Sequence, residues 1–219
     1  MDENKTIYLI RHGQTKGNTE GNWLGSRSVD PLNEYGKKQA RDTADTLKKR
    51  AVDASKIYSS PTPRALMHAE IIQHDLNFPI EKIHSITEMN LGVLEDKSRS
   101  QGIHLLPQEV KDWKENLKKF DPPLGETALE SYERFSETVK LLAVNNPKRD
   151  VIFITHGIVI KLFLAKVLRE SIETGEIKIN VPWTRHGSIS IFKFDGQGFK
   201  FIKVIENKYP DSKEVANFG

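Results

Sequence analysis

The chain has 219 residues, of which 37% are hydrophobic and 29% are charged, so it is long enough to bury a sizeable core. A formal net charge of +3 is too small to indicate nucleic acid or a membrane surface as a partner, and the absence of cysteine excludes disulfides, thiolate metal sites and a cysteine nucleophile. No apolar run approaches the length of a membrane span and no apolar leader precedes the first predicted strand, so we expect a cytoplasmic protein.

The first half of the chain alternates short apolar runs with helical patterns. A short apolar run predicts a strand, and apolar positions that recur every three or four residues predict a helix. Proline is tolerated in the first turn of a helix, so Pro61 and Pro63 indicate where the second helix begins. The predicted elements are, in order, a strand over 7–10, a helix over 33–51, a strand over 56–60, a helix from 61 onward, and a strand over 79–85.

The second half begins with a polar stretch, 88–102, that we interpret as a loop. The run Asp121-Pro122-Pro123-Leu124-Gly125 separates two helical patterns, and Asp195-Gly196 begins the turn of a predicted hairpin. The predicted elements are helices over 105–120 and 126–144, a strand over 151–155, a helix over 158–169, and hairpin strands over 188–194 and 199–205.

Strands that alternate with helices predict a three-layer α/β fold, in which helices flank both faces of a mostly parallel sheet. No linker rich in Gly, Pro or Ser divides the chain, so we expect a single domain over residues 1–219. We interpret the segment from about 88 to 146 as a helical insertion over the active edge of the sheet.

The residues that follow two of the predicted strands carry the functional signal. Arg11-His12-Gly13 follows the first strand, and His156-Gly157 follows the strand over 151–155. Ligands of open α/β sheets bind beyond the carboxyl ends of strands, so these side chains are expected to converge on one pocket. A neutral histidine can attack phosphorus when one ring nitrogen is fixed by a hydrogen bond to a nearby carbonyl. We therefore expect His12 to be the nucleophile of a phosphoryl transfer.

Phosphoryl transfer also needs donors for the phosphate oxygens and a proton donor for the leaving oxygen. Arg11 and Arg64 offer planar guanidinium groups, Asn18 offers an amide, and His156 offers a further donor if it is protonated beside a dianion. Gly13 and Gly157 would let the backbone approach the phosphate. Glu88 is the candidate for general acid and then general base, with a pKa raised in a partly closed pocket.

In combination, these segments resemble the histidine phosphatase superfamily, which includes the cofactor-dependent phosphoglycerate mutases. The run Arg11-His12-Gly13-Gln14-Thr15 with Asn18 is similar to the family signature, and Ser59-Ser60-Pro61 with Arg64 is similar to the loop of its second arginine. Glu88 with Gly92 resembles the acid/base segment, and His156-Gly157 resembles the second histidine. The resemblance covers most of the chain and implies a mixed α/β sheet flanked by helices.

The resemblance leaves the reaction open between hydrolysis and mutase chemistry. The mutases carry Glu-Arg-His-Tyr-Gly at the acid/base segment, where this chain has Glu88-Met89-Asn90-Leu91-Gly92. Since the residues that would hold a carboxylated sugar phosphate in both orientations are missing, we expect hydrolysis of a small phosphorylated metabolite, without metal or cofactor. Cofactor-dependent phosphoglycerate mutase activity and a regulatory binding module of the same fold stay open as alternatives.

Several residues allow more than one interpretation. Thr15 either contacts the substrate or only caps its loop, and His68 has no motif around it, which favours a packing or surface role. Arg185-His186-Gly187 repeats the tripeptide without a preceding strand, so we expect a loop that enters the hairpin, with His186 at the pocket rim. Trp23, Trp113 and Trp183 can be core residues or pocket walls. We expect a monomer or homodimer with no nucleic-acid or membrane partner.

Overall fold

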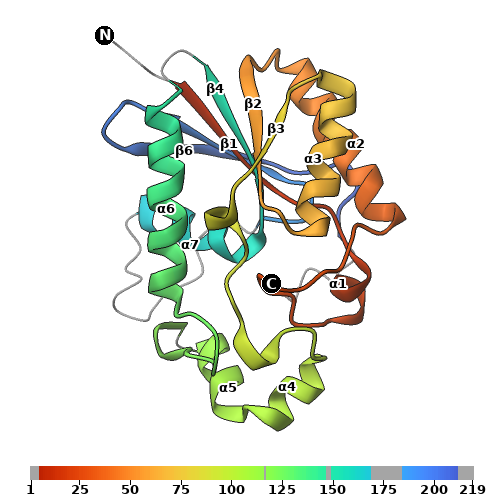
Figure 1. Ribbon diagram of the computed structural model, residues 1–219, viewed down its shortest axis with the longest axis vertical. Coiled ribbons are helices and arrows are strands. Elements are labelled where there is room, and N and C mark those ends of the chain that lie inside the picture. The colour runs from red at the N-terminus through yellow and green to blue at the C-terminus, as the bar shows by residue number, and fades with distance from the viewer. Residues whose placement is uncertain (1–4, 116, 147–148, 169–183, 212–219) are drawn as a thin grey trace.

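One sheet of six strands organises the computed structural model, which describes residues 5–115, 117–146, 149–168 and 184–211 (Figure 1). The strand order is β3-β2-β4-β1-β5-β6, in which the first four strands are parallel, β5 pairs antiparallel with β1, and β6 pairs antiparallel with β5. This order confirms the predicted α/β fold with a mostly parallel sheet. The strands are β1 Lys5–Arg11, β2 Ala54–Ser59, β3 Ile80–Lys82, β4 Asp150–Thr155, β5 Ile189–Phe194 and β6 Phe199–Ile205.

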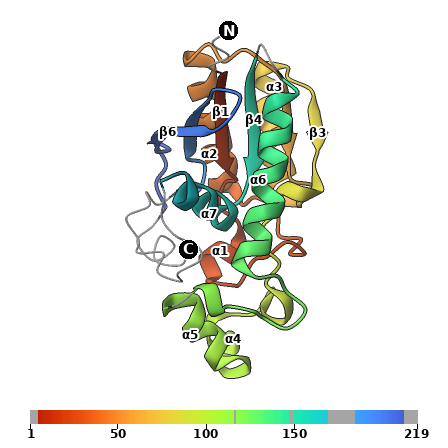
Figure 2. The same ribbon diagram turned by 90° about the vertical axis from the view of Figure 1, so that its left-hand side faces the viewer.

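Helices cover both faces of the sheet (Figure 2). The central strands read as continuous apolar runs because successive side chains enter opposite cores. Ile7 and Leu9 pack with the helices over 128–144 and 157–167, and Tyr8 and Ile10 pack with the helices over 34–49 and 63–76. The helices are α1 Lys16–Glu20, α2 Glu34–Lys49, α3 Pro63–Leu76, α4 Arg99–Leu105, α5 Pro107–Glu115, α6 Ala128–Val144 and α7 Gly157–Val167, with 3₁₀ turns at His84–Ile86, Gly92–Leu94 and Leu117–Lys119.

Short helices account for most of the differences from the predicted elements. The interpretation of 88–102 as a loop is wrong at its end, because Ser98 and Gln101 form a reciprocal capping box that begins α4. The single helix predicted over 105–120 is also wrong, since Pro107 disfavours helical backbone at Leu106 and begins α5. The strand predicted over 79–85 ends at Lys82.

The helical insertion is shorter than the sequence predicts. α4 and α5 lie beyond the carboxyl ends of the strands, at the bottom of Figure 1. α6 instead runs along β4 and packs Phe135 and Val139 into the core with Phe153, so it belongs to a covering layer of the sheet. No helix in the described part of the chain is long and apolar enough to cross a membrane. Position 169 of the helix predicted over 158–169 lies outside the described residues.

Candidate active site

The carboxyl ends of β1 and β4 bring the two motif histidines together. Arg11 pairs with Thr155 in the parallel register, and the His12 amide donates to the Thr155 carbonyl at 2.9 Å. The rings of His12 and His156, which follow these strands directly, have centroids 5.0 Å apart. The predicted convergence of both histidines on one site is confirmed.

His12 is held in the orientation that the sequence argument requires. Its Nδ1 donates to the Gly13 carbonyl at 2.7 Å, which leaves Nε2 as an acceptor for Arg64 Nε at 3.2 Å. His68, predicted only to pack or lie at the surface, is buried and accepts the Gly13 amide on Nδ1 at 3.0 Å. Burial, and then the positive charges around it, lower the pKa of His12 well below its usual value, so the ring is neutral.

Arg64 reaches His12 from the first turn of α3 and is fully buried. Its two terminal nitrogens donate to the carbonyls of Ser28 and Gly25, at 2.9 and 2.8 Å, so its Nε stays directed at the histidine. A guanidinium with three fixed donors is pre-organised for a phosphoryl oxygen that arrives beside Nε2.

Arg11 lies against the start of α7. A Cβ at position 157 would lie 2.9 Å from the Arg11 guanidinium carbon, so Gly157 is what lets the arginine lie there. Gly157 also lines the cavity, as predicted for a residue close to the phosphate. At Gly13, by contrast, a Cβ would collide with the Gly36 carbonyl, so packing of the loop against α2 explains that glycine.

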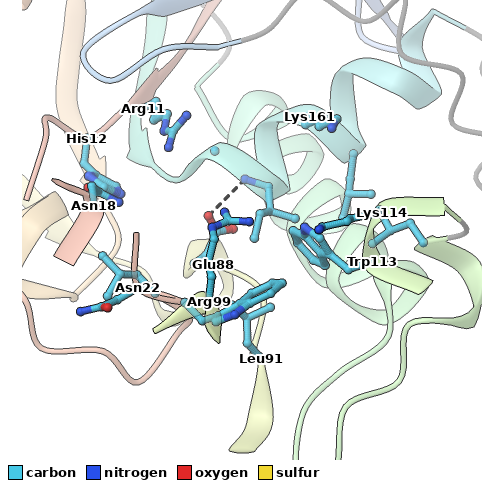
Figure 3. A pocket seen from close by; sticks show the side chains of 16 residues that line it. Arg11, His12, Asn18, Asn22, Glu88, Leu91, Arg99, Trp113, Lys114 and Lys161 are labelled. Carbon is cyan, nitrogen blue, oxygen red and sulfur yellow. Dashed lines mark hydrogen bonds between the residues drawn. The ribbon is translucent and has the colours of Figure 1, made fainter. Parts of the chain in front are cut away.

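Glu88 places a carboxylate at the N-terminus of α7 (Figure 3). Its oxygens accept the amides of Met89, Ile158 and Val159 at 3.0–3.2 Å. Burial raises the pKa of Glu88, against the opposing effects of these amides and the neighbouring arginines, which confirms the predicted direction. Arg134 of α6 donates to the Glu88 carbonyl at 3.4 Å and thereby braces this segment.

His156 is a neutral ring among the protein groups that surround it. Burial, and then the charges of Arg64 and Arg11, lower its pKa well below the usual value, and its protonation beside a phosphate dianion stays a prediction. Its Nε2 lies 2.9 Å from Ser60 Oγ and 3.3 Å from Thr62 Oγ1, and Nδ1 has no hydrogen-bond partner among the described residues. If the hydroxyls donate to Nε2, the proton sits on Nδ1, and the neutral ring can still donate to a ligand.

Asn18 lines the cavity, whereas Thr15 does not line it in the described part of the chain. Thr15 is fully buried and forms the N-cap of α1, and its hydroxyl donates to Asn18 Oδ1 at 3.0 Å. The prediction of Thr15 as a substrate-binding residue is therefore replaced by its alternative, a cap that orients Asn18.

His186 is buried behind Arg11, so its predicted place at the pocket rim is wrong. Its ring centroid lies 5.6 Å from that of His12, and its Nε2 accepts from Arg11 at 3.0 Å. Its Nδ1 lies 2.8 Å from a carboxylate oxygen of Asp211. Burial lowers the pKa of His186 to about 4, so the neutral ring donates from Nδ1 to Asp211 and accepts from Arg11 on Nε2. Asp211, His186 and Arg11 therefore form one chain of hydrogen bonds, which we call the relay.

A cavity of about 340 Å³ opens from His12 toward α5 and α7. Its outer wall is apolar and aromatic, and it includes Trp23 and Trp113, whose rings pack edge to face at 5.4 Å. Trp23 is at once a pocket wall and a core residue, while Trp183 lies outside the described residues. Among the residues that the structure describes, no group of three or more Asp, Glu, His or Cys side chains is placed to hold a metal ion.

Comparisons with known proteins identify the family of the chain. A family model described as the histidine phosphatase superfamily (branch 1) matches residues 7–207. A probable phosphoglycerate mutase GpmB of Escherichia fergusonii is 31% identical over 167 residues, 74% of each chain, and an uncharacterized phosphatase PhoE of Bacillus subtilis is 29% identical over 161 residues, 74% of this chain and 76% of its own. The solved structure of YhfR from Bacillus stearothermophilus superposes with a TM-score of 0.83 at 26% identity, over 96% of this chain and 99% of that one.

Proposed function

Since the chain belongs to the histidine phosphatase superfamily, we propose that it hydrolyses a phosphomonoester through a phosphohistidine on His12. The observation that carries the proposal is the orientation of the His12 ring. The hydrogen bond from Nδ1 to the Gly13 carbonyl leaves a neutral Nε2 beside Arg64 and on the cavity that Glu88 lines. A nucleophile, an oxyanion donor and an acid then face one reacting phosphorus.

In the first step, the Nε2 lone pair of His12 attacks phosphorus, an N–P bond forms and the bond from phosphorus to the ester oxygen breaks. Arg64, Arg11 and the Asn18 amide stabilise the equatorial oxygens, and His156 adds a further donor. Glu88 gives its proton to the departing oxygen. The phosphate dianion would push the pKa of Glu88 further above its usual value, because two negative charges then share the cavity.

In the second step, the Glu88 carboxylate takes a proton from water, the water oxygen attacks phosphorus and the N–P bond breaks. The products are inorganic phosphate, neutral His12 and protonated Glu88, so the cycle closes. The chain itself supplies every group that these two steps require. We therefore expect turnover without added metal or cofactor.

Mutase activity is the second candidate, because one of the relatives named above is a probable phosphoglycerate mutase. A mutase must keep the phosphohistidine away from water, whereas a phosphatase must admit water. The segment Glu88-Met89-Asn90-Leu91-Gly92 supplies no cation beside the carboxylate, which favours hydrolysis over binding of a phosphoglycerate in two orientations.

Two assays separate the candidates. Release of phosphate from an aryl phosphate, in buffer treated to remove divalent metals, should be saturable and lost in His12→Ala. Interconversion of the two monophosphoglycerates, primed with 2,3-bisphosphoglycerate, should be slow or absent. Rapid interconversion would establish the mutase, and absence of both activities on a broad panel of phosphomonoesters would favour a regulatory binding module.

A further inference from the structure

Gln39 of α2 is fully buried, and its side chain joins two segments that lie far apart in the sequence. Its Oε1 accepts the Gln14 amide at 2.8 Å. Its Nε2 donates to the Tyr209 carbonyl at 2.9 Å and to Asp211 Oδ1 at 3.2 Å. An N–H at one end and oxygens at the other fix which way the side-chain amide lies. An apolar side chain would pack α2 equally well, so a polar group at this position needs another explanation.

The amide that Gln39 holds belongs to the same peptide group as the carbonyl that holds the nucleophile. His12 Nδ1 donates to the Gly13 carbonyl at 2.7 Å, and the next backbone N–H, that of Gln14, donates to Gln39. The peptide group between Gly13 and Gln14 is planar, and no peptide bond in the described residues is cis, so its C=O and N–H point in opposite directions. Gln39 and His12 therefore hold opposite edges of one rigid plane.

Glycine at position 13 makes support for this plane necessary. The close Gly36 carbonyl leaves no room for a Cβ at Gly13, and a glycine restricts the rotation of its peptide groups less than any other residue. The peptide group after Gly13 thus needs a partner from outside the loop. Donation of its N–H to Gln39 also polarises its carbonyl, which strengthens the hydrogen bond from His12 Nδ1.

The other end of the Gln39 side chain meets the carboxylate of the relay. Asp211 Oδ1 accepts from Gln39, while Oδ2 accepts the His186 amide at 3.1 Å and lies 2.8 Å from His186 Nδ1. His186 Nε2 in turn accepts from Arg11. The two oxygens of one carboxylate, in the C-terminal stretch over 207–211, therefore lead to both His12 and Arg11.

We propose that Gln39 is a positioning residue for His12, and that Asp211 fixes the nucleophile and Arg11 relative to each other through its two oxygens. The inference rests on the proposed function, because it takes His12 as the nucleophile. Gln39 does not line the described cavity, so it acts only through the peptide group that it holds. A tilt of this group would turn the His12 ring away from the phosphorus, and a small misplacement of a reacting group costs much of the rate.

Gln39→Met tests the proposal because it keeps the length of the side chain and removes its hydrogen bonds. We expect single-turnover hydrolysis of an aryl phosphate, with enzyme in excess, to be about tenfold slower than in the wild type. Inhibition by inorganic phosphate should stay close to wild type, since Arg64 and Arg11 keep their own hydrogen bonds. Gln39→Glu keeps an acceptor for the Gln14 amide and should be faster than Gln39→Met. If Gln39→Met does not fold, Gln39→Asn replaces it, because the shorter side chain cannot span from Gln14 to Asp211.

The proton on His12 Nδ1 gives a second measurement, which does not depend on turnover. A short hydrogen bond in a buried site shifts its NMR resonance downfield and slows its exchange with water, and its loss in His12→Ala assigns it. In Gln39→Met and Gln39→Asn, this resonance should move upfield or disappear through exchange. In Gln39→Glu it should stay at its wild-type position, and its absence from the wild type would contradict the proposal.

Asp42→Asn is the matched control. Asp42 also lies on α2 and holds the C-terminal stretch, but through Lys208 rather than through Asp211. It should lower thermal stability and leave the single-turnover rate and the His12 resonance unchanged. The proposal is overturned if folded Gln39→Met or Gln39→Asn keeps the wild-type rate and resonance, if Gln39→Glu is as slow as Gln39→Met, or if Asp42→Asn changes both measurements as much. If the wild type hydrolyses no phosphomonoester, the proposed function itself fails, and the resonance still decides whether Gln39 holds His12.

Discussion

Replacement of Asp211 by asparagine tests whether the C-terminal stretch positions Arg11. The side chain keeps its size and one acceptor oxygen, so His186 Nδ1 can still donate to it, but the negative charge is lost. We expect Asp211→Asn to lower kcat/KM for an aryl phosphate and to weaken inhibition by inorganic phosphate, because Arg11 is then held by a less strongly oriented ring.

The structure bounds the size of this effect. Burial by itself raises the pKa of Asp211, but the hydrogen bond from His186 and the charge of Arg11 outweigh it and bring the pKa from 3.8 down to about 2. That difference corresponds to roughly 2 kcal/mol in favour of the carboxylate at neutral pH. If most of this energy holds Arg11 in place, kcat/KM should fall about tenfold to thirtyfold.

The assay needs a variant that loosens the same stretch without touching the relay. Asp42 of α2 accepts the Lys208 amide at 2.9 Å and pairs with the Lys208 ammonium at 3.1 Å. Asp42→Asn should therefore lower thermal stability but leave kcat/KM and the inhibition constant of phosphate unchanged. Both variants are measured at a temperature where thermal unfolding shows them fully folded.

Two results would refute the relay. Asp211→Asn could keep the wild-type kcat/KM and phosphate inhibition, which would mean that Arg11 does not depend on His186. Asp42→Asn could lose as much activity as Asp211→Asn, which would mean that the C-terminal stretch acts only through general stability.

Three further predictions follow from the site. Glu88→Gln should lower kcat by about a hundredfold or more for alkyl phosphates, and less for aryl phosphates with good leaving groups. It should also abolish the decline of activity as pH rises through the elevated pKa of Glu88. Equal losses for both kinds of substrate, or an activity that still declines at high pH, would exclude Glu88 as the acid. His186 has a pKa of about 4 in the folded protein against 6.5 when unfolded, so its contribution to stability is complete above pH 6.5 and is lost as pH falls toward 4. Between pH 7 and pH 5, the free energy of unfolding should therefore fall by roughly 2 kcal/mol less in His186→Asn than in the wild type. Equal decreases in both proteins would contradict burial of a neutral ring. Thr15→Ala should lower the free energy of unfolding by about 1 kcal/mol and Tm by about 2–4 °C, and Thr15→Ser should stay close to wild type. An unchanged Tm in Thr15→Ala would contradict the role of Thr15 as the N-cap of α1.

The central strands can be predicted from the sequence because their burial leaves a simple pattern in neighbouring residues. β1 and β4 are buried on both faces, so each reads as an unbroken apolar run that ends in polar residues. The place of His12, His156 and Gly157 then follows from the parallel register. Even the hydrogen bond of His12 to a neighbouring carbonyl could be anticipated, because it needs only adjacent backbone.

The parts that the sequence did not reveal depend on short elements or on distant pairs. α1 and α4 have five and seven residues, too few for a helical period, and a signal for α4 lay instead in its capping box, Ser98-x-x-Gln101. Asp211 has no motif around it and reaches His186 only because residues near the C-terminus pack on α2. Its hydrogen bonds with Gln39 and His186 cannot be read from local spacing.

Trapping of the phosphorylated enzyme tests the central proposal most directly. The protein is mixed with a radiolabelled phosphomonoester, quenched in the steady state and digested, and the labelled peptide is identified. We predict acid-labile, base-stable phosphate on His12 in the wild type, retained on His12 in His156→Ala and absent from His12→Ala. Label on His156, or label that persists in His12→Ala, would contradict His12 as the nucleophile.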